Sequence, residues 1–166
     1  MKKTSAGLIL YRQRSGKLEV LIAHMGSPWW ARKDKGAWSI PKGEYTDEQP
    51  LEAARREFKE ELGHEPPSGQ LVELGSIEQN NNKTVMAWAV EGDLDVSKVV
   101  SNTITIEWPP RSGQTQEFPE IDKAAWFDLP TASTKVIAAQ AEFFNRLAEK
   151  LDVEIEPDQP VQGSLF

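Results

Sequence analysis

The sequence contains no cysteine among its 166 residues, so disulfide bonds and thiol catalysis are excluded. Histidine is also scarce: His24 and His64 are not spaced as a zinc pair, and we expect both to be structural or solvent-exposed. No apolar run approaches the roughly 18 residues that a transmembrane helix needs. The first residues, Met1-Lys2-Lys3, lead directly into a strand pattern, so a soluble cytoplasmic protein is the default expectation.

The chain also lacks an excess of positive charge. It has 19 basic and 26 acidic residues, a net charge of -7, which argues against broad electrostatic binding to nucleic acid or to anionic membranes. Its 39% hydrophobic and 27% charged residues are ordinary for a globular protein, and its length suits one domain with a substantial core.

The most informative segment runs from Gly43 to Gly63 and reads GEYTDEQPLEAARREFKEELG. Pro50 is tolerated in the first turn of a helix, and Gly63 can end one in the left-handed conformation, so a helix is predicted between them. At 3.6 residues per turn, Glu57, Glu60 and Glu61 project from one face. The other face carries Leu51, Ala54 or Arg55, Phe58 and Leu62.

Three clustered carboxylates repel one another unless a cation offsets their charge. Hard oxygen ligands favour Mg²⁺ or Mn²⁺, and these ions in turn favour a polyphosphate. We therefore expect phosphate to be bound locally through metal. The plainer alternative is a solvated acidic face, with Arg56 and Lys59 as ion-pair partners.

The segment resembles the signature of the Nudix hydrolases, G-x5-E-x7-R-E-U-x-E-E-x-G-U, in which U is an aliphatic or bulky apolar residue. Two positions depart from it: four residues rather than five separate Gly43 from Glu48, and His64 occupies the last apolar position. The matching residues are Glu48, Arg56, Glu57, Phe58, Glu60, Glu61 and Gly63.

This resemblance implies a metal-dependent hydrolase of phosphoanhydride bonds. In the family the glutamates of this motif hold one to three metal ions, which makes Glu57, Glu60 and Glu61 the expected ligands of Mg²⁺ or Mn²⁺. The carbonyl of Gly43 commonly joins them, although the short loop affects its placement. One of the glutamates can also act as general base, and the sequence does not assign it.

The resemblance also implies supporting roles outside the metal ligands. Arg56 orients one of the motif carboxylates, and Glu48 pairs within the unit formed by the loop and the helix. Many members place a further glutamate shortly before the last strand as a ligand or base. Glu120 fits that placement and Glu117 is its competitor, the alternative being a surface carboxylate on a loop.

Six tryptophans are a high number for this length, and three crowd the segment before the motif. Trp38 lies in a strand pattern and is expected in the core, whereas Trp29 or Trp30, in a loop with interleaved basic residues, could stack a nucleobase. Lys42 and Arg12 are further candidates to contact phosphate, with plain surface charge as the alternative for each.

We predict one Nudix-like α/β/α sandwich with a mixed sheet, a domain over residues 1–151 and a C-terminal tail over residues 152–166. A polar, tryptophan-bearing loop is expected over residues 26–36, and an irregular loop from Pro109. The predicted strands span residues 4–11, 18–25, 37–40, 71–79, 84–90, 102–108 and 124–127. A second amphipathic helix is expected from about Thr131 to Leu151.

The last five residues, Gln162 to Phe166, resemble the Q-x-x-L-F peptide by which many bacterial DNA-processing proteins bind the replication sliding clamp. A tail that docks on its own domain or stays disordered is the plainer interpretation.

Three classes of function remain. The first is a metal-dependent pyrophosphohydrolase of a nucleoside diphosphate linked to another moiety, such as a dinucleoside polyphosphate, an oxidised nucleoside triphosphate or ADP-ribose. The second is a catalytically silent nucleotide-binding regulator on the same fold, and the third is a clamp-tethered interaction protein. The motif recognises only the diphosphate, so it does not identify the substrate.

Overall fold

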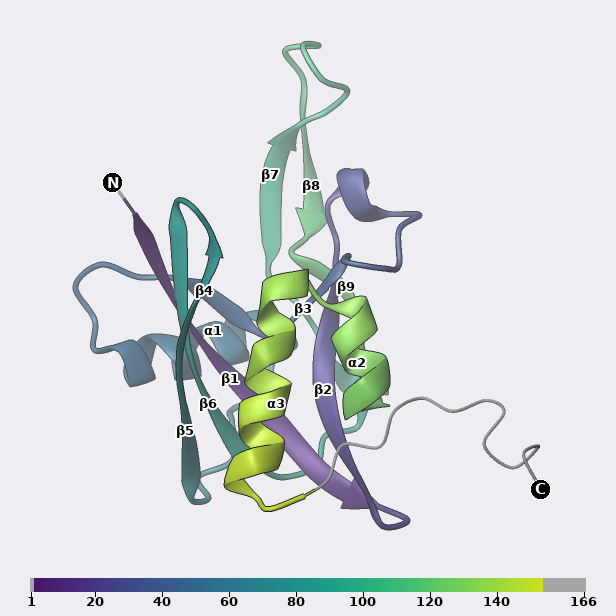
Figure 1. Cartoon of the computed structure of the whole chain (residues 1–166). Helices are drawn as coiled ribbons and strands as arrows, with labels where there is room; N and C mark the ends of the chain where they lie inside the picture. Colours follow the sequence, from purple (N-terminus) through teal and green to yellow (C-terminus); the bar gives the residue numbers. More distant parts are fainter. Residues whose placement is uncertain (1, 154–166) are drawn as a thin grey trace.

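The computed structural model describes residues 2–153, and the expected clamp-binding peptide at Gln162 to Phe166 lies outside them. A seven-stranded mixed sheet is covered on one face by α1 and on the other by α2 and α3 (Figure 1). The strands are β1 Lys3–Arg14, β2 Lys17–Met25, β3 Trp38–Ser39, β4 Lys42–Glu44, β5 Leu71–Asn80, β6 Lys83–Glu91, β7 Thr103–Glu107, β8 Thr115–Pro119 and β9 Ile121–Asp128. The helices are α1 Pro50–Leu62, α2 Leu129–Lys135 and α3 Ala141–Lys150, with short 3₁₀ turns η1 Pro28–Trp30, η2 Val96–Lys98 and η3 Ala138–Gln140. The α/β/α architecture predicted from the sequence is confirmed.

Strands β1 and β2 form the predicted hairpin but stay paired only near their turn. Tyr11 to Arg14 of β1 pair with Lys17 to Val20 of β2. Beyond this stretch β1 pairs with β4 and β2 pairs with β3, so the two strands diverge around a β3–β4 insert. The insert fits closely because Gly7 has no side chain: a β-carbon there would lie 2.8 Å from the carbonyl oxygen of Pro41. This opening in the sheet positions the site described below.

Alternating side chains of the central strands supply two hydrophobic cores. Leu8 and Leu10 of β1 pack on the side of Phe58 in α1, whereas Ile9 packs on the side of Phe143 and Phe144. This period of two is what a strand buried on both faces requires, and it explains why the N-terminal strand reads as a continuous apolar run.

Helix α1 begins and ends where the sequence predicts. Pro50 occupies its first turn, and Gly63 ends it with φ 74°, in the left-handed region that favours glycine. Ala54, rather than Arg55, lies on the buried face with Phe58 and Leu62.

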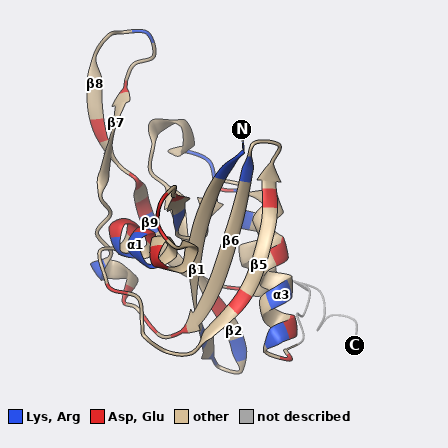
Figure 2. Ribbon diagram, turned by 90° about the vertical axis from the view of Figure 1, so that its left-hand side faces the viewer, with Lys and Arg blue, Asp and Glu red and all other residues tan. Residues whose placement is uncertain are grey.

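The irregular loop predicted from Pro109 is present but short, because it forms the turn of a two-stranded hairpin. Strand β8 was not predicted, because its sequence Thr-Gln-Glu-Phe-Pro is mostly polar and exposed. It pairs with β7 outside the main sheet, with Ile104 opposite Phe118 and Ile106 opposite Gln116. The hairpin projects from the body of the molecule in both ribbon views (Figures 1 and 2).

The single helix predicted from Thr131 to Leu151 is also wrong. Two helices, α2 and α3, are separated by an extended residue, Val136, with ψ 164°. Val136 forms an isolated bridge with Trp38, and the N–H of Ile137 donates to the Trp38 carbonyl at 3.0 Å. Backbone pairing with β3 therefore outweighs the helical periodicity of these apolar residues.

The other differences are small. The strand predicted over residues 37–40 is reduced to Trp38–Ser39, and the last strand begins at Ile121 rather than at residue 124.

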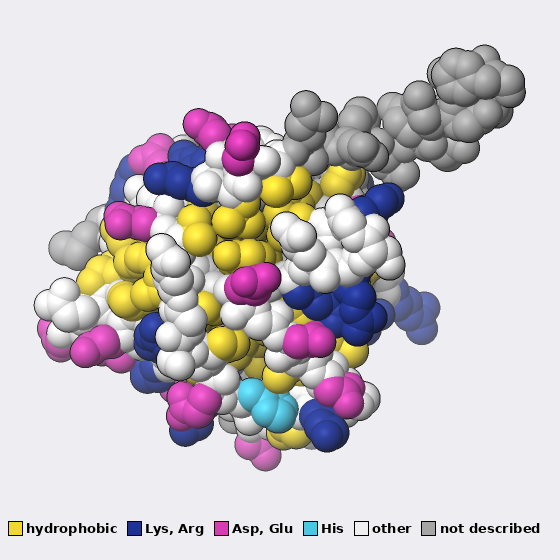
Figure 3. All heavy atoms as spheres, turned by 90° about the horizontal axis from the view of Figure 1, so that it is seen from below, with side chains coloured by type: hydrophobic (Ala, Val, Ile, Leu, Met, Phe, Trp, Pro, Cys, Tyr) yellow, Lys and Arg dark blue, Asp and Glu magenta, His cyan; other side chains and the backbone are white. Residues whose placement is uncertain are grey.

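No helix within residues 2–153 is long and apolar enough to cross a membrane. The end of the molecule opposite the hairpin carries acidic and basic side chains dispersed among hydrophobic ones (Figure 3).

Candidate active site

Three glutamates from distant parts of the chain meet beside α1. One carboxylate oxygen each from Glu57, Glu61 and Glu120 lies within 4.8 Å of the others. Glu57 and Glu61 stand one helical turn apart on α1 and are 7% and 6% exposed, and Glu120 precedes β9. Such an oxygen-only, largely buried donor set suits a divalent cation such as Mg²⁺ or Mn²⁺.

Glu60 lies apart from this cluster. The helix directs it toward Arg56, whose Nη1 donates to both of its carboxylate oxygens at 3.2 Å. The sequence placed Glu60 on the same face as Glu57 and Glu61. Successive residues of a helix point about 100° apart, so Glu60 points away from its neighbour Glu61 and meets Arg56, one turn earlier, instead of the cluster. Glu120 completes the set in its place, whereas its competitor Glu117 is exposed on β8.

Arg56 holds the loop before α1 and one carboxylate of the cluster at once. Its Nε and Nη2 donate to Glu48 at 2.8 and 2.6 Å, and its Nη1 donates to Glu57 Oε2 at 2.6 Å. These contacts match the roles that the motif implies for Arg56 and Glu48. The ion-pair network raises the pKa of Arg56, chiefly through its hydrogen bonds to Glu48, and lowers that of Glu48.

Gly43 of β4 faces the cluster across a very short gap. A β-carbon added there would overlap the carboxylate group of Glu57. The backbone of β4 therefore approaches the glutamates as closely as only glycine permits, which places the Gly43 peptide group beside the carboxylates.

The cluster brings carboxylates together in a buried environment. Burial raises the pKa of Glu61 well above its ordinary value, and the neighbouring charge of Glu120 and a hydrogen bond with it raise it further. Burial also raises the pKa of Glu57, against the opposing hydrogen bond from Arg56. Both effects disfavour the ionised forms, and a bound divalent cation would reverse them.

The backbone of Glu120 is held on both sides. Its N–H donates to the Asn102 carbonyl at the base of β7 at 2.9 Å, and its carbonyl accepts from the N–H of Gly26 at 3.0 Å. Asn102 is in turn tied to α1, since its N–H donates to the Glu60 carbonyl at 2.9 Å. Residues 26–36, which we call the tryptophan loop, and the β7–β8 hairpin thus meet at the third carboxylate of the cluster.

A pocket of about 220 Å³ opens over Glu61 and Glu120. Its walls come from the divergent ends of β2, β3 and β4, the tryptophan loop, the base of β7 and the segment between α2 and α3. The lining residues are Ala23, Met25, Ser27, Trp30, Ser39, Lys42, Glu61, Ile104, Glu120, Ile121 and Ile137.

Two of the proposed substrate-contacting residues, Trp30 and Lys42, line this pocket. The half-buried ammonium of Lys42 has its pKa lowered by desolvation and by Lys83, with Glu61, Glu44 and Glu57 opposing the shift. Trp29 is 52% exposed and lies outside the pocket lining. Trp38 is buried in the core, as expected.

Arg12 was a candidate for phosphate contact, and the structure places it elsewhere. It lies near the turn of the β1–β2 hairpin, donates to Glu19 and Asp93 at 2.9 and 2.6 Å, and stacks over the Trp126 ring at 4.0 Å. The sequence showed only a basic residue after an apolar strand. Its partners become apparent only in the structure, where Glu19 lies opposite it in the β1–β2 hairpin and Asp93 comes from a distant segment.

Both histidines have structural positions, as expected. His24 is buried, with Nδ1 2.8 Å from Asp122 Oδ1 and Nε2 2.6 Å from the Lys33 carbonyl oxygen, so it connects the tryptophan loop to β9. His64 Nε2 lies 2.8 Å from the Lys98 carbonyl oxygen.

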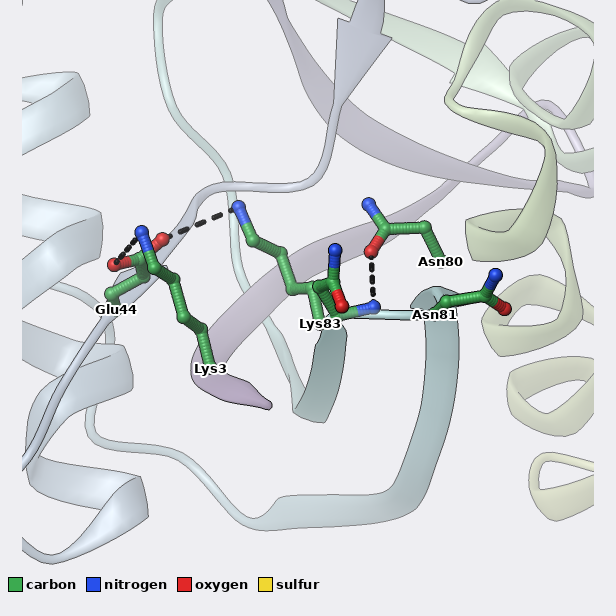
Figure 4. Close-up of a pocket in the computed structure, with 6 residues that line it drawn as sticks. Lys3, Glu44, Asn80, Asn81 and Lys83 are labelled. Carbon is green, nitrogen blue, oxygen red and sulfur yellow. Dashed lines mark hydrogen bonds and ion pairs between the residues drawn. The ribbon is translucent and has the colours of Figure 1, made fainter. Parts of the chain in front are cut away.

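A second pocket of about 450 Å³ lies beside Glu44, the last residue of β4 (Figure 4). Lys3 and Lys83 approach the same carboxylate, that of Glu44, at 3.9 and 3.4 Å, and Asn80, Asn81 and Asn82 form the remaining wall. This pocket has one carboxylate and no aromatic residue, so it lacks the metal-ligand set of the first.

Sequence reasoning missed the apolar contributions to the first pocket. Ile104 and Ile137 read as ordinary strand and helix residues, and no local pattern distinguishes them from core. The alternating Thr-Ile-Thr-Ile-Glu of β7 did indicate a strand with one apolar face. This pattern predicts that the face packs against another part of the protein or against a ligand.

The family model and the solved structures that resemble this chain indicate one and the same fold. The family model of the NUDIX domain matches residues 1–147. Among solved structures, the chain is similar to the NUDIX domain of Shewanella oneidensis NrtR complexed with ADP ribose, with a TM-score of 0.61 and 14% identity over 91% of this chain and 89% of that one. No curated protein sequence matches the chain significantly.

Two further structures have comparable similarity. A C. elegans Ap4A hydrolase in a binary complex has a TM-score of 0.58 and 22% identity, over 90% of this chain and 98% of that one. The C-terminal domain of mouse MUTYH, in a complex with human PCNA, has a TM-score of 0.57 and 15% identity, over 100% of this chain and 99% of that one. At these identities the similarity concerns the fold alone.

Proposed function

The chain belongs to the Nudix family, and we propose that it is a metal-dependent pyrophosphohydrolase acting on a nucleoside diphosphate linked to another moiety. The observation that carries this proposal is the buried set of Glu57, Glu61 and Glu120 beside the Gly43 backbone. All the core carboxylates of the motif are present, which disfavours a catalytically silent regulator.

The donor set fits Mg²⁺ or Mn²⁺, because it consists of oxygen atoms and carries more negative charge than its buried environment supports. Glu57, Glu61 and Glu120 would hold the ion, with the Gly43 carbonyl as a further ligand. When bound, the metal supplies neutralisation of the phosphate oxygens and a more acidic water.

The protein residues supply positioning and proton transfer. Arg56 fixes the orientation of Glu57, so the carboxylate does not rotate away as charge changes at the site. Lys42 lines the pocket beside Glu61 and can face a phosphate oxygen. The proton of the attacking water is accepted within the group of three carboxylates.

The organic part of the substrate would occupy the pocket over Glu61 and Glu120, with Trp30 in its wall. Aromatic rings stack on nucleobases with little dependence on the base. Substrates that fit this description are a dinucleoside polyphosphate, an oxidised nucleoside triphosphate and ADP-ribose. The neighbouring structures of an Ap4A hydrolase and of a NUDIX domain complexed with ADP ribose support this class.

The test is a hydrolysis panel of these three substrate types with Mg²⁺ or Mn²⁺, followed by product analysis. We expect a chelator to abolish activity, and we expect Glu61→Gln to lower kcat by a factor of about 100 or more while the protein stays folded. Glu52→Gln, an exposed change on the same helix, is the matched control. Full activity in the presence of a chelator would refute the metal-dependent mechanism.

A further inference from the structure

The β7–β8 hairpin has one apolar face that the rest of the molecule leaves partly uncovered. Ile104 and Ile106 of β7, and Trp108 directly after it, are half-buried, while Thr103, Thr105 and Glu107, which alternate with them, are exposed. Phe118 of β8 lies directly opposite Ile104 and is also half-buried. Side chains two positions apart on a strand, and opposite residues of an antiparallel pair, share one face.

This face points toward the pocket and the tryptophan loop. At its base, Ile104 lines the pocket together with Trp30, Glu61 and Glu120. At its far end, the ring of Trp108 meets the ring of Trp29 edge-on, with centroids 4.9 Å apart. The hairpin and the loop therefore make contact at their outer ends and flank the pocket at their inner ends.

The two segments also meet beneath the pocket, through the backbone of Glu120. That residue donates to Asn102 of the hairpin base and accepts from Gly26 of the loop. The close approach requires glycine, because a β-carbon on Gly26 would overlap the carbonyl oxygen of Pro119. The pocket between the two segments carries two of the clustered carboxylates, Glu61 and Glu120, with Trp30 on the side of the loop and Ile104 on the side of the hairpin.

A two-stranded hairpin is marginally stable in water by itself, and an apolar face gains stability when it is covered. The occupant must reach the carboxylates of the pocket, which favour a metal-bound diphosphate. It must also be flat and weakly polar where it touches the walls. A nucleobase joined to a diphosphate has both properties.

We propose that the β7–β8 hairpin is a substrate-binding wall whose apolar face, Ile104, Ile106, Trp108 and Phe118, holds the nucleobase against the tryptophan loop. This proposal rests on the proposed function, which supplies the class of ligand: a nucleoside diphosphate whose phosphates lie over Glu61 and Glu120. It assigns selection of the organic moiety to a segment outside the Nudix motif.

The experiment measures binding rather than turnover, by calorimetry on the full chain with Mg²⁺. The ligands are ADP, GDP, CDP and UDP, and inorganic pyrophosphate serves as the ligand without a base. The variants are Trp108→Ala and Ile106→Ala, with Thr105→Ala as the control on the opposite, exposed face of the same strand. A melting curve of each variant verifies that it is folded.

We expect the tightest-binding nucleoside diphosphate to lose about 5- to 150-fold in affinity with Trp108→Ala, the range for loss of one aromatic stacking contact. Ile106→Ala should weaken the same ligand less, and Thr105→Ala should leave it unchanged. The affinity for pyrophosphate should stay the same in all variants.

The proposal is overturned if neither substitution weakens nucleotide binding, or if nucleotide and pyrophosphate weaken equally, since the hairpin would then act only by placing Glu120. Wild-type protein that binds no nucleoside diphosphate better than pyrophosphate also overturns it. The two proposals can fail separately. If the protein hydrolyses none of the substrates in the panel, but Trp108→Ala loses its preference for nucleotide over pyrophosphate, the proposed function is refuted and the role of the hairpin in binding is supported.

Discussion

At the scale of single residues, Glu61 is a buried carboxylate, 6% exposed, that lies beside two others, Glu57 and Glu120. Its folded-state pKa is raised by burial and by Glu120, so in the metal-free protein the folded state binds more protons than the unfolded state above the ordinary glutamate pKa. The contribution of Glu61 to stability is therefore fully present below that ordinary value and is lost as pH rises through the folded-state pKa.

We predict that Glu61→Gln raises the melting temperature of the metal-free protein at pH 8, because the amide removes the cost of a buried charge. At a pH below the ordinary glutamate pKa the difference should disappear, since both side chains are then neutral. Thermal melts with a chelator across this pH range measure the effect.

Adding Mg²⁺ in excess should reverse the order of the two proteins. At about 100 times its dissociation constant, a ligand that binds only the folded state stabilises it by about 2.7 kcal/mol. The wild type should gain this stability and Glu61→Gln should gain little. Equal stabilisation of both proteins by Mg²⁺ would place the ion somewhere other than this cluster.

Gly43 offers a second test at the same scale. Because a β-carbon there overlaps the Glu57 carboxylate, Gly43→Ala should displace that carboxylate and lower the hydrolysis rate by about 100-fold, a typical cost of misplacement by about 1 Å. Gly69→Ala is the matched control: its β-carbon would make only an ordinary contact, 3.4 Å from Val90 Cγ2. If Gly43→Ala has the same steady-state kinetics as the wild type, the backbone of β4 shifts enough to accept the β-carbon without displacing Glu57.

At the scale of elements, a buried amide connects the 3₁₀ turn before α3 to the insert between β1 and β2. Gln140 is fully buried; its Oε1 accepts from the Ile40 N–H at 2.9 Å, and its Nε2 donates to Gln79 Oε1 at 2.9 Å and to Ser39 Oγ at 3.1 Å. The insert carries Lys42 and Gly43, so the hydrogen bonds of this amide help to hold these two site residues in position.

Gln140→Leu keeps the size of the side chain and removes these hydrogen bonds. Leaving the buried Ile40 N–H without a partner should lower the free energy of unfolding by roughly 1 to 3 kcal/mol. Urea denaturation measures the change, with Gln70→Leu on the exposed surface as control. A loss no greater than that of the control would mean that the insert does not depend on this residue.

The elements that the sequence predicted correctly are those whose signals are local. Pro50 and Gly63 mark the ends of α1 in the chain itself, and the apolar runs of β1 and β2 flank a polar turn. The break between α2 and α3 was missed because its cause is distant: Trp38, about a hundred positions earlier, pairs with Val136. Strand β8 was missed because its pairing with β7, and not its composition, makes it a strand.

The candidate site shows the same division. Spacing on one helix identified Glu57 and Glu61, and the resemblance added Glu120 and Gly43. Spacing alone could not show that Glu60 turns to Arg56 or that Arg12 is neutralised by Asp93, since both outcomes depend on three-dimensional neighbours. The walls of the pocket come from six separate segments, so no single stretch of sequence could indicate them.

At the scale of the whole molecule, the pocket, the carboxylate cluster and the contacts described above all lie within residues 2–153. The peptide Gln162 to Phe166 lies outside them, and we retain the proposal that it binds a bacterial sliding clamp. Two apolar anchors on a short segment typically give about micromolar affinity.

Deleting these five residues should abolish clamp binding and leave both hydrolysis and the melting temperature unchanged. Surface plasmon resonance with immobilised clamp measures the first effect, and the substrate panel measures the second. A lower melting temperature together with no measurable clamp binding in the full chain would instead show that the tail packs on its own domain.

Strand β1 is the first element of the chain, yet it lies in the middle of the sheet and pairs in parallel with β6 from Lys3–Lys83 to Tyr11–Glu91. During synthesis, β1 therefore leaves the ribosome long before its partner exists. Until Glu91 has emerged, the apolar side chains of β1 can be covered only by elements that precede β6 in the chain, such as β2, β4 and α1. Such sequence-distant pairing slows folding, so the central strand of the sheet gains its parallel partner late.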